Sequence, residues 1–131
     1  MKVTNLLIFL TLSLNVYSYQ FSDSEMNSML QEAANEYSKN LSVALDAGTI
    51  LIGVVAGMER NLVYKYKLTF TSLNDPTINI LIGRVTRKHI NNYCTNPKLS
   101  FYRKEGVLID HYFYDSVGKH LFTVRTSTSR C

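Results

Sequence analysis

The chain has 131 residues, of which 46% are hydrophobic and 18% charged, with a formal net charge of +4. This length supports one domain with one core, and the apolar share is too high for a disordered chain. Two cysteines are too few for a disulfide-dense scaffold or a four-thiolate zinc site. The composition therefore predicts one small α+β domain.

Residues 1–18 have the pattern of a secretory signal that is cleaved after export. Lys2 precedes the apolar run 6–14, and Ser18 supplies the small residue of a cleavage site. The run is too short to cross about 30 Å of hydrocarbon, and no later stretch has about 18 uninterrupted apolar residues. We expect residues 19–131 to form a single α+β domain without an integral membrane segment, in the periplasm or outside the cell.

Export gives the two cysteines a clear interpretation. Cys94 and Cys131 are the only thiols of the chain. In an oxidising compartment a lone pair most simply bonds to itself, which would tie the last residue of the chain to its middle. The chain-entropy model assigns such a bond about 4 kcal/mol of stability. The sequence therefore predicts a structural disulfide.

The first half of the domain has the pattern of a helix followed by two strands. Ser22 and Glu25 form a capping box, and apolar residues at helical spacing continue the predicted helix to just before Gly48. Residues 49–56 are apolar and β-branched, which predicts a strand that is buried on at least one face. After a turn at 57–61, residues 62–71 alternate between apolar and polar, which predicts a half-buried antiparallel strand. The predicted helix carries this apolar set: Met26, Met29, Leu30, Ala33, Tyr37, Leu41 and Ala44.

The second half predicts two helices and a terminal hairpin. Asp75 and Pro76 are typical of a helix start, and the apolar spacing runs on to Tyr93. A short third helix is expected between Asn96 and Gly106. Residues 107–114 and 119–127 then predict two strands around a turn. We expect an antiparallel sheet of about four strands, packed by the N-terminal helix and one or two further helices; the pairing of the two hairpins stays open.

The candidate chemistry argues against an enzyme. The chain has neither a glycine-rich phosphate loop nor a nucleophile or metalloprotease motif. The chain has three histidines, His89, His111 and His120. His111 and His120 could share a metal, but no third ligand stands at a recognisable spacing, so we predict neither a metal nor a cofactor. His111 and His120 share a sheet face if Phe113 pairs with His120, and lie on opposite faces if Gly118 forms a bulge that pairs Tyr114 with His120.

The basic charge is concentrated in the middle of the chain. Between Glu59 and Glu105, nine basic residues stand against three acids, and tyrosines lie among them. Export disfavours nucleic acid as the partner, so we predict a protein partner that is attracted by the positive charge of these residues. The predicted contact is an unpaired sheet edge or the strand segment Tyr64, Lys65, Tyr66 and Lys67.

Most of residues 25–131 resembles a group of small exported bacterial proteins that carry one disulfide. The features that match are GMERNLVYKY over 57–66, Cys94, Gly106, YFYD over 112–115, Gly118 and Cys131. The chain is also similar to the pilotins that chaperone secretin subunits of type II secretion. Those pilotins are typically lipoproteins, and this chain has no lipobox cysteine. The resemblance implies a non-enzymatic protein-binding module that serves envelope or secretion-system assembly.

A second, local resemblance is to cystatins. A helix that contains AANEYSK over 33–39 precedes GVVAG over 53–57, which is similar to the loop that cystatins insert into papain-type cysteine proteases. Gly53 stands where cystatins have glutamine, and the chain has no tryptophan for their second wedge. This resemblance implies the alternative function of a protease inhibitor, with Val54, Val55, Ala56 and Gly57 as the inhibitory loop.

Overall fold

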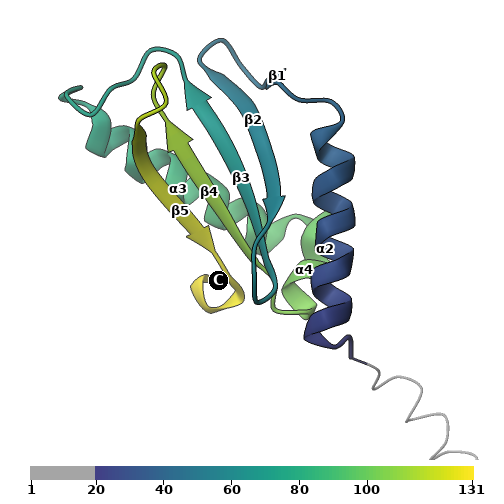
Figure 1. Ribbon diagram of the computed structural model, residues 1–131. Coiled ribbons are helices and arrows are strands. Elements are labelled where there is room, and N and C mark those ends of the chain that lie inside the picture. Colours follow the sequence, from purple (N-terminus) through teal and green to yellow (C-terminus); the bar gives the residue numbers. More distant parts are fainter. Residues whose placement is uncertain (1–19) are drawn as a thin grey trace, which may run out of the picture.

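The computed structural model describes residues 20–131, so the predicted signal segment 1–18 lies outside the described residues (Figure 1). The elements in chain order are helix α2 (Asp23–Ser38), strands β1 (Val43–Ala44), β2 (Thr49–Ala56) and β3 (Asn61–Leu68), helix α3 (Ile78–Thr95), the 3-10 turn η1 (Pro97–Leu99), helix α4 (Ser100–Lys104), strands β4 (Leu108–Tyr114) and β5 (His120–Thr126), and the 3-10 turn η2 (Thr128–Arg130). Among these residues no helix is long and apolar enough to cross a membrane.

The α+β class is confirmed, but the sheet differs from the prediction in two ways. It has five strands in the order β1-β2-β3-β4-β5, and β3 pairs with β4 in parallel, so the sheet is mixed rather than antiparallel. Parallel pairing needs a connection of about a dozen residues or more, and the segment with α3, η1 and α4 supplies it between the two strands. The extra strand β1 comes from residues that were predicted to be helical.

Both long helices cover the same face of the sheet (Figure 1). The side chains of Met26 and Leu30 from α2 pack with Val54, Leu62 and Ile109 of the sheet. A second cluster lies under α3 and is built around Tyr66, Leu68, Phe113, Phe122 and Val124. Because alternate residues of a strand point to opposite faces, the polar positions between these residues lie on the face without helices, called here the open face.

Helix α2 begins where the sequence predicts and ends earlier. Ser22 Oγ accepts a hydrogen bond from Glu25 N at 3.1 Å, and Glu25 Oε1 accepts one from Ser22 N at 3.1 Å, which completes the capping box. The helix ends at Ser38, whose hydroxyl donates to Val54 O of β2 at 3.1 Å. Asn40, Ser42 and Val43 have lower helix propensity than most residues of α2 before them, and sheet pairing of β1 with β2 replaces the predicted last turns.

The turn between β2 and β3 fastens the start of α2 to the start of β4. Arg60 takes a positive φ of 58° there, and its backbone N–H donates to Asn27 Oδ1 of α2 at 3.1 Å. Its guanidinium donates to Asp23 Oδ1 at 2.6 Å and to the carbonyl oxygen of Glu105 at 2.8 Å. One side chain therefore joins three segments that are far apart in the sequence.

The crossover helices follow the predicted pattern with shifted ends. Asp75 Oδ1 accepts hydrogen bonds from the Thr77 backbone N–H at 2.8 Å and from its hydroxyl at 2.7 Å, which forms a turn, and α3 starts only at Ile78. The predicted third helix consists of η1 and α4, and Gly106 with a φ of 66° ends it.

The terminal hairpin adopts the bulged register. Gly118 has a φ of 89°, Tyr114 pairs with His120, and Phe113 pairs with Phe122. This is the second of the two registers that the sequence left open. It places His111 on the face that the helices cover and His120 on the open face.

Replacing Ser22 with alanine should lower the melting temperature, because the N-cap hydroxyl of α2 is lost. An N-cap contributes about 1 kcal/mol, which corresponds to about 4 °C in a domain of this size. Thermal unfolding followed by circular dichroism measures the shift. Ser24→Ala is the matched control, since Ser24 is exposed in the same helical turn. An equal shift in both variants would contradict the capping role.

Candidate functional site

An apolar groove lies between α2 and the segment formed by η1 and α4. Its volume is about 490 Å³. One wall consists of α2 side chains and the other of side chains that follow the end of α3. We call it the α2–α4 groove. It is lined by Met26, Met29, Leu30, Ala33, Tyr37, Asn96, Lys98, Leu99, Phe101 and Tyr102.

Helix α2 lines the groove with a second apolar stripe. Met26, Leu30 and Ala34 recur at every fourth residue and are at most 1% exposed, so they form the core stripe. Met29, Ala33 and Tyr37 recur at the same spacing one residue earlier in each turn, and Met29 is 38% and Tyr37 49% exposed. A helix that packs against one sheet needs only one stripe. The second stripe leaves apolar surface available along about 12 Å of helix.

The rim of the groove carries charges of opposite sign. Glu32 and Glu36 of α2 are exposed beside a shallow hollow that shares Met29 and Ala33 with the groove. Glu36 Oε2 lies 2.8 Å from Lys39 Nζ, while Lys98 stands on the opposite wall. Because Lys39 pairs with Glu36, the net negative charge on the α2 side of the rim comes from Glu32, and a basic residue of a bound segment would match it there.

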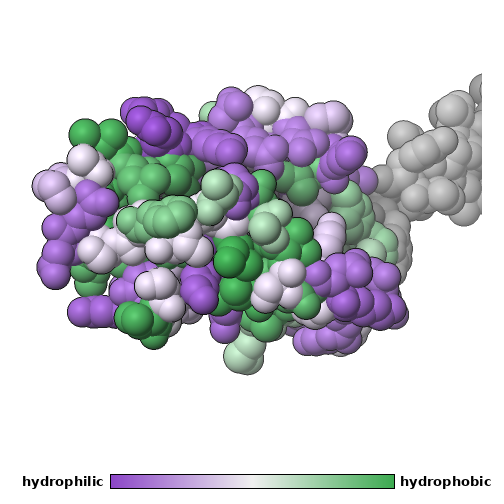
Figure 2. Space-filling model, turned by 90° about the horizontal axis from the view of Figure 1, so that it is seen from above, coloured by the Kyte–Doolittle hydropathy of each residue, from purple (hydrophilic) through white to green (hydrophobic). Residues whose placement is uncertain are grey.

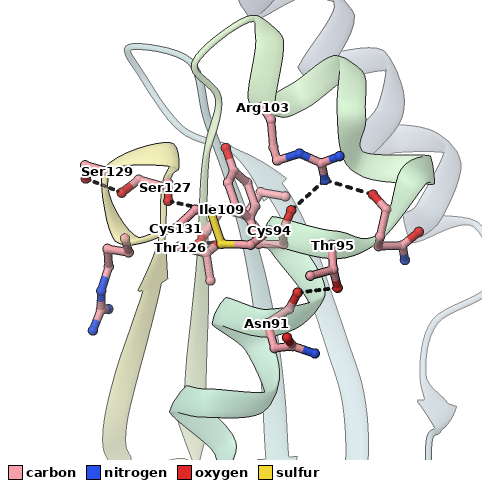
Figure 3. The surroundings of a disulfide bond; sticks show 12 residues. Asn91, Cys94, Thr95, Arg103, Ile109, Thr126, Ser127, Ser129 and Cys131 are labelled. Atoms are coloured by element: carbon pink, nitrogen blue, oxygen red, sulfur yellow. Dashed lines mark hydrogen bonds between the residues drawn. A yellow bond between two sulfur atoms is a disulfide. The ribbon is translucent and has the colours of Figure 1, made fainter.

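The predicted disulfide holds the second wall in place. Cys94 near the end of α3 is bonded to Cys131, which follows η2 (Figure 3). Close by, the Arg103 guanidinium donates to Tyr93 O at 2.7 Å and to Asn96 O at 2.8 Å. The bond fixes the end of α3, and Arg103 folds α4 back against it.

The four residues predicted to contact a partner lie on a central strand, not on a sheet edge. Tyr64 and Tyr66 point to the helix-covered face, where Tyr66 is 6% exposed, and Lys65 and Lys67 lie on the open face. Burial raises the pKa of both tyrosines above the ordinary value. Of these four residues, only Lys65 and Lys67 present their side chains on the open face. The partner contact remains a prediction, and it now concerns mainly these two lysines.

The segment compared with cystatins lies at the end of β2. Val54 is 3% exposed and belongs to the core, whereas Val55 on the open face is 43% exposed. Gly57 N donates to Asn61 O at 2.8 Å and closes the turn into β3. Val54 and Ala56 therefore belong to a paired strand rather than to a free loop, and the inhibitory role stays a prediction.

Two histidines that the sequence left unassigned meet inside the domain. The rings of His89 on α3 and His111 on β4 are stacked with centroids 3.8 Å apart, and His111 Nδ1 lies 2.8 Å from the Tyr66 hydroxyl. They line a cavity of about 200 Å³ between α3 and the sheet. No group of three or more His, Cys, Asp or Glu side chains within residues 20–131 is arranged to hold a metal ion.

Burial keeps both histidines neutral. It lowers the pKa of His89 to about 4, with a smaller effect from Lys88. Burial also lowers the pKa of His111 to about 3, and the neighbouring His89 lowers it further. A stacked pair of neutral imidazoles packs like the aromatic side chains around it.

The α2–α4 groove was not predicted from the sequence. A signal for it was present, because the apolar positions of α2 cover more of the helix surface than one contact requires. The residues of the second wall show no comparable excess of apolar positions in the sequence. Leu99, Phe101 and Tyr102 face α2 only because the crossover brings η1 and α4 back alongside it.

Comparison with solved structures identifies the class of fold. The domain matches a crystal structure from Pseudomonas aeruginosa described as a "putative secreted protein", with a TM-score of 0.72 and 16% identity over 87% of this chain and 99% of that one. It also matches the pilotin EpsS from the Vibrio vulnificus type 2 secretion system, with a TM-score of 0.65 and 12% identity over 83% of this chain and 94% of that one.

A third match supports the same fold. The type II secretion system pilotin AspS from Vibrio cholerae aligns with a TM-score of 0.61 and 12% identity over 83% of this chain and 94% of that one. No protein-family model and no curated protein matches the sequence. The predicted resemblance to pilotins is therefore confirmed in the three-dimensional fold, at identities that reveal the fold alone.

Removing the disulfide should destabilise the domain by about 4 kcal/mol, because the unfolded chain loses its cross-link. We expect Cys94→Ser/Cys131→Ser to unfold at lower urea concentration than the oxidised protein. Treating the unsubstituted protein with a reducing agent should produce the same loss, while the double variant should not respond to the agent. Equal unfolding of oxidised and reduced protein would contradict a stabilising role.

The histidine pair should make stability depend on pH. The unfolded chain takes up two protons as the pH falls below about 6.5, whereas the folded domain resists protonation until about 4 at His89 and about 3 at His111. Their contribution is complete above pH 6.5 and is lost as the pH falls toward the folded pKa values.

Urea unfolding between pH 6 and pH 4.5 measures this dependence. His89→Phe should reduce the slope by about 1 kcal/mol per pH unit, because a group that takes up most of a proton on unfolding is removed. His120→Gln is the matched control, since His120 is exposed on the open face. An unchanged slope in His89→Phe would show that His89 is not buried as a neutral group.

Proposed function

We propose that this chain is a non-enzymatic, exported protein-binding module of the periplasm or the extracellular space, and that it serves envelope or secretion-system assembly. The observation that carries the proposal is the α2–α4 groove in a fold shared with type II secretion pilotins. Exposed apolar side chains line this groove on a domain that is otherwise held rigid by a disulfide and by Arg60. A rigid apolar groove suits recognition of a protein segment.

The shape and charge of the groove define the segment that it takes. The exposed stripe on α2 is about 12 Å long, which matches about two turns of a helix laid alongside it. Met29, Tyr37 and Phe101 offer the apolar contacts, and Glu32 lies at the rim. The partner is therefore an amphipathic helical segment of a protein, with an apolar face toward the groove and a basic residue toward α2.

Site-specific photo-crosslinking in the protein's own compartment tests this proposal. A photo-reactive residue at Tyr37 should capture one protein through one segment, and a synthetic peptide of that segment should bind the purified domain. Met29→Ser and Phe101→Ser should each lower the affinity of the domain for this peptide at least about tenfold, because hydrophobic anchors at the centre of an interface dominate affinity. Both side chains are exposed, 38% and 37%, so the variants should remain folded.

Reactive groups at three further positions separate the alternatives. Ser129 in η2 is exposed, does not line the groove and is the control. Capture through Lys65 instead of Tyr37 would move the contact to the open face of the sheet. A papain-type protease captured through Val55 would favour the cystatin-like inhibitor, for which Val55→Asp should reduce potency. Capture at Tyr37 no stronger than at Ser129 would overturn the groove as the binding site.

A further inference from the structure

The sheet topology gathers three loops at one end of the molecule. Strand β2 begins where β3 ends, β4 runs parallel to β3 and ends beside it, and β5 begins at the same point. Segments 45–48, 69–77 and 115–119 therefore lie together at the upper end in Figure 1. We call this region, together with the start of α3, the loop end.

The loop end presents large apolar side chains to solvent. Val117 is 86% exposed, Phe70 82%, Ile80 65%, Leu45 54% and Leu73 43%. Figure 2 looks onto this end and shows hydrophobic patches separated and bordered by hydrophilic surface. Phe70 and Leu73 lie in the β3–α3 loop, Leu45 and Val117 in two other loops, and Ile80 in the first turn of α3. Neither the α2–α4 groove nor the histidine cavity includes any of them. The apolar surface consists of protruding tips.

The acidic residues of the loop end are engaged in shaping its turns. Asp46 accepts a hydrogen bond from Gly48 N at 2.8 Å, Asp75 from Thr77 N at 2.8 Å, and Asp115 from Val117 N at 3.0 Å. Each aspartate closes a turn in the usual manner of short acidic side chains. Their negative charges are thus held beside the backbone of the three loops.

Basic residues outnumber these aspartates. Lys119 lies exposed in the β4–β5 turn, and Lys67 is half-buried near the end of β3. Helix α3 contains no acidic residue, and Arg84, Arg87 and Lys88 on it are exposed. Arg84 and Lys88 follow Ile80 at intervals of four residues, so these side chains lie along one outward strip of the helix. The strip is apolar at its start and basic beyond it.

We propose that the loop end docks onto the surface of an anionic phospholipid bilayer, with Phe70, Val117 and Ile80 inserted at the headgroup boundary and the basic strip of α3 against the phosphates. Exposed apolar side chains from separate segments suit a fluid bilayer, which closes around each of them, whereas a protein partner would need a matching hollow for every one. Apolar residues next to exposed arginine and lysine are the combination that binds membrane interfaces.

The docking surface is separate from the α2–α4 groove. The groove is built from α2, η1 and α4, none of which contributes to the loop end. A bilayer bound at the loop end would leave the groove open to a protein segment. Cys94 and Cys131 are bonded to each other, so neither thiol carries a lipid, and this contact uses only ordinary side chains.

Vesicle flotation of the exported protein tests the proposal. Vesicles of phosphatidylglycerol and phosphatidylethanolamine should carry the protein, while vesicles of phosphatidylcholine should carry at least about fivefold less, because the basic strip finds no net negative charge there. Phe70→Ser/Val117→Ser should abolish flotation, and Arg84→Gln/Arg87→Gln should reduce it. Met58→Ser is the control for the apolar change, since Met58 is 85% exposed at the opposite end of the sheet. Lys104→Gln is the control for charge.

A fluorescent reporter measures insertion directly. The chain has no tryptophan, so Phe70→Trp adds a single indole whose emission should shift to shorter wavelength when anionic vesicles are added. Met58→Trp should show no shift. The proposal would be overturned if the unsubstituted protein did not float with anionic vesicles, or if Phe70→Ser/Val117→Ser floated as well as the unsubstituted protein. It would also be overturned if the emission of Met58→Trp shifted as much as that of Phe70→Trp. Loss of a bound protein from Phe70→Ser/Val117→Ser with flotation unchanged would assign the loop end to a protein instead.

Discussion

The parallel pairing of β3 with β4 is the constraint on which the rest of this structure depends. Two parallel neighbours cannot be joined by a tight turn, so the chain between them must cross the sheet. Helix α3 is that crossover, and it covers the second half of the helix-covered face. Its path buries Tyr66 and stacks His89 on His111. The disulfide from Cys94 to Cys131 then joins the end of the crossover to the segment after the last strand (Figure 3).

The α2–α4 groove and the loop end both follow from the same crossover. On its way back to β4 the chain forms η1 and α4 beside α2, which creates the α2–α4 groove. Because β3 and β4 then run in the same direction, the loops at their ends meet at one end of the sheet. The domain therefore presents a concave apolar groove and a protruding apolar end on different elements. Geometry of this kind suits a module that binds a protein segment while it rests on another surface.

Local signals in the sequence predicted most elements because each depends on its own residues. The capping box of Ser22 and Glu25, the β-branched run 49–56 and the turn at Gly118 all form as expected. Predictions failed where two distant segments compete. The last turns of the predicted first helix became β1, since Val43 and Ala44 gain backbone partners in β2. The alternation of residues 62–68 forms β3 as predicted, but the strand ends at Leu68 rather than at residue 71, and Phe70 is exposed.

The sequence by itself determined the α+β class, the Cys94–Cys131 bond and the resemblance to pilotins, because composition, cysteine number and motif spacing are properties of one chain read in order. It left two registers open for the terminal hairpin, and the bulge at Gly118 selected the one that separates His111 from His120. Only the tertiary structure decided the parallel pair, the groove and the loop end. Each of these depends on contacts between residues far apart in the chain, and the free energy of such contacts leaves no local pattern in the sequence.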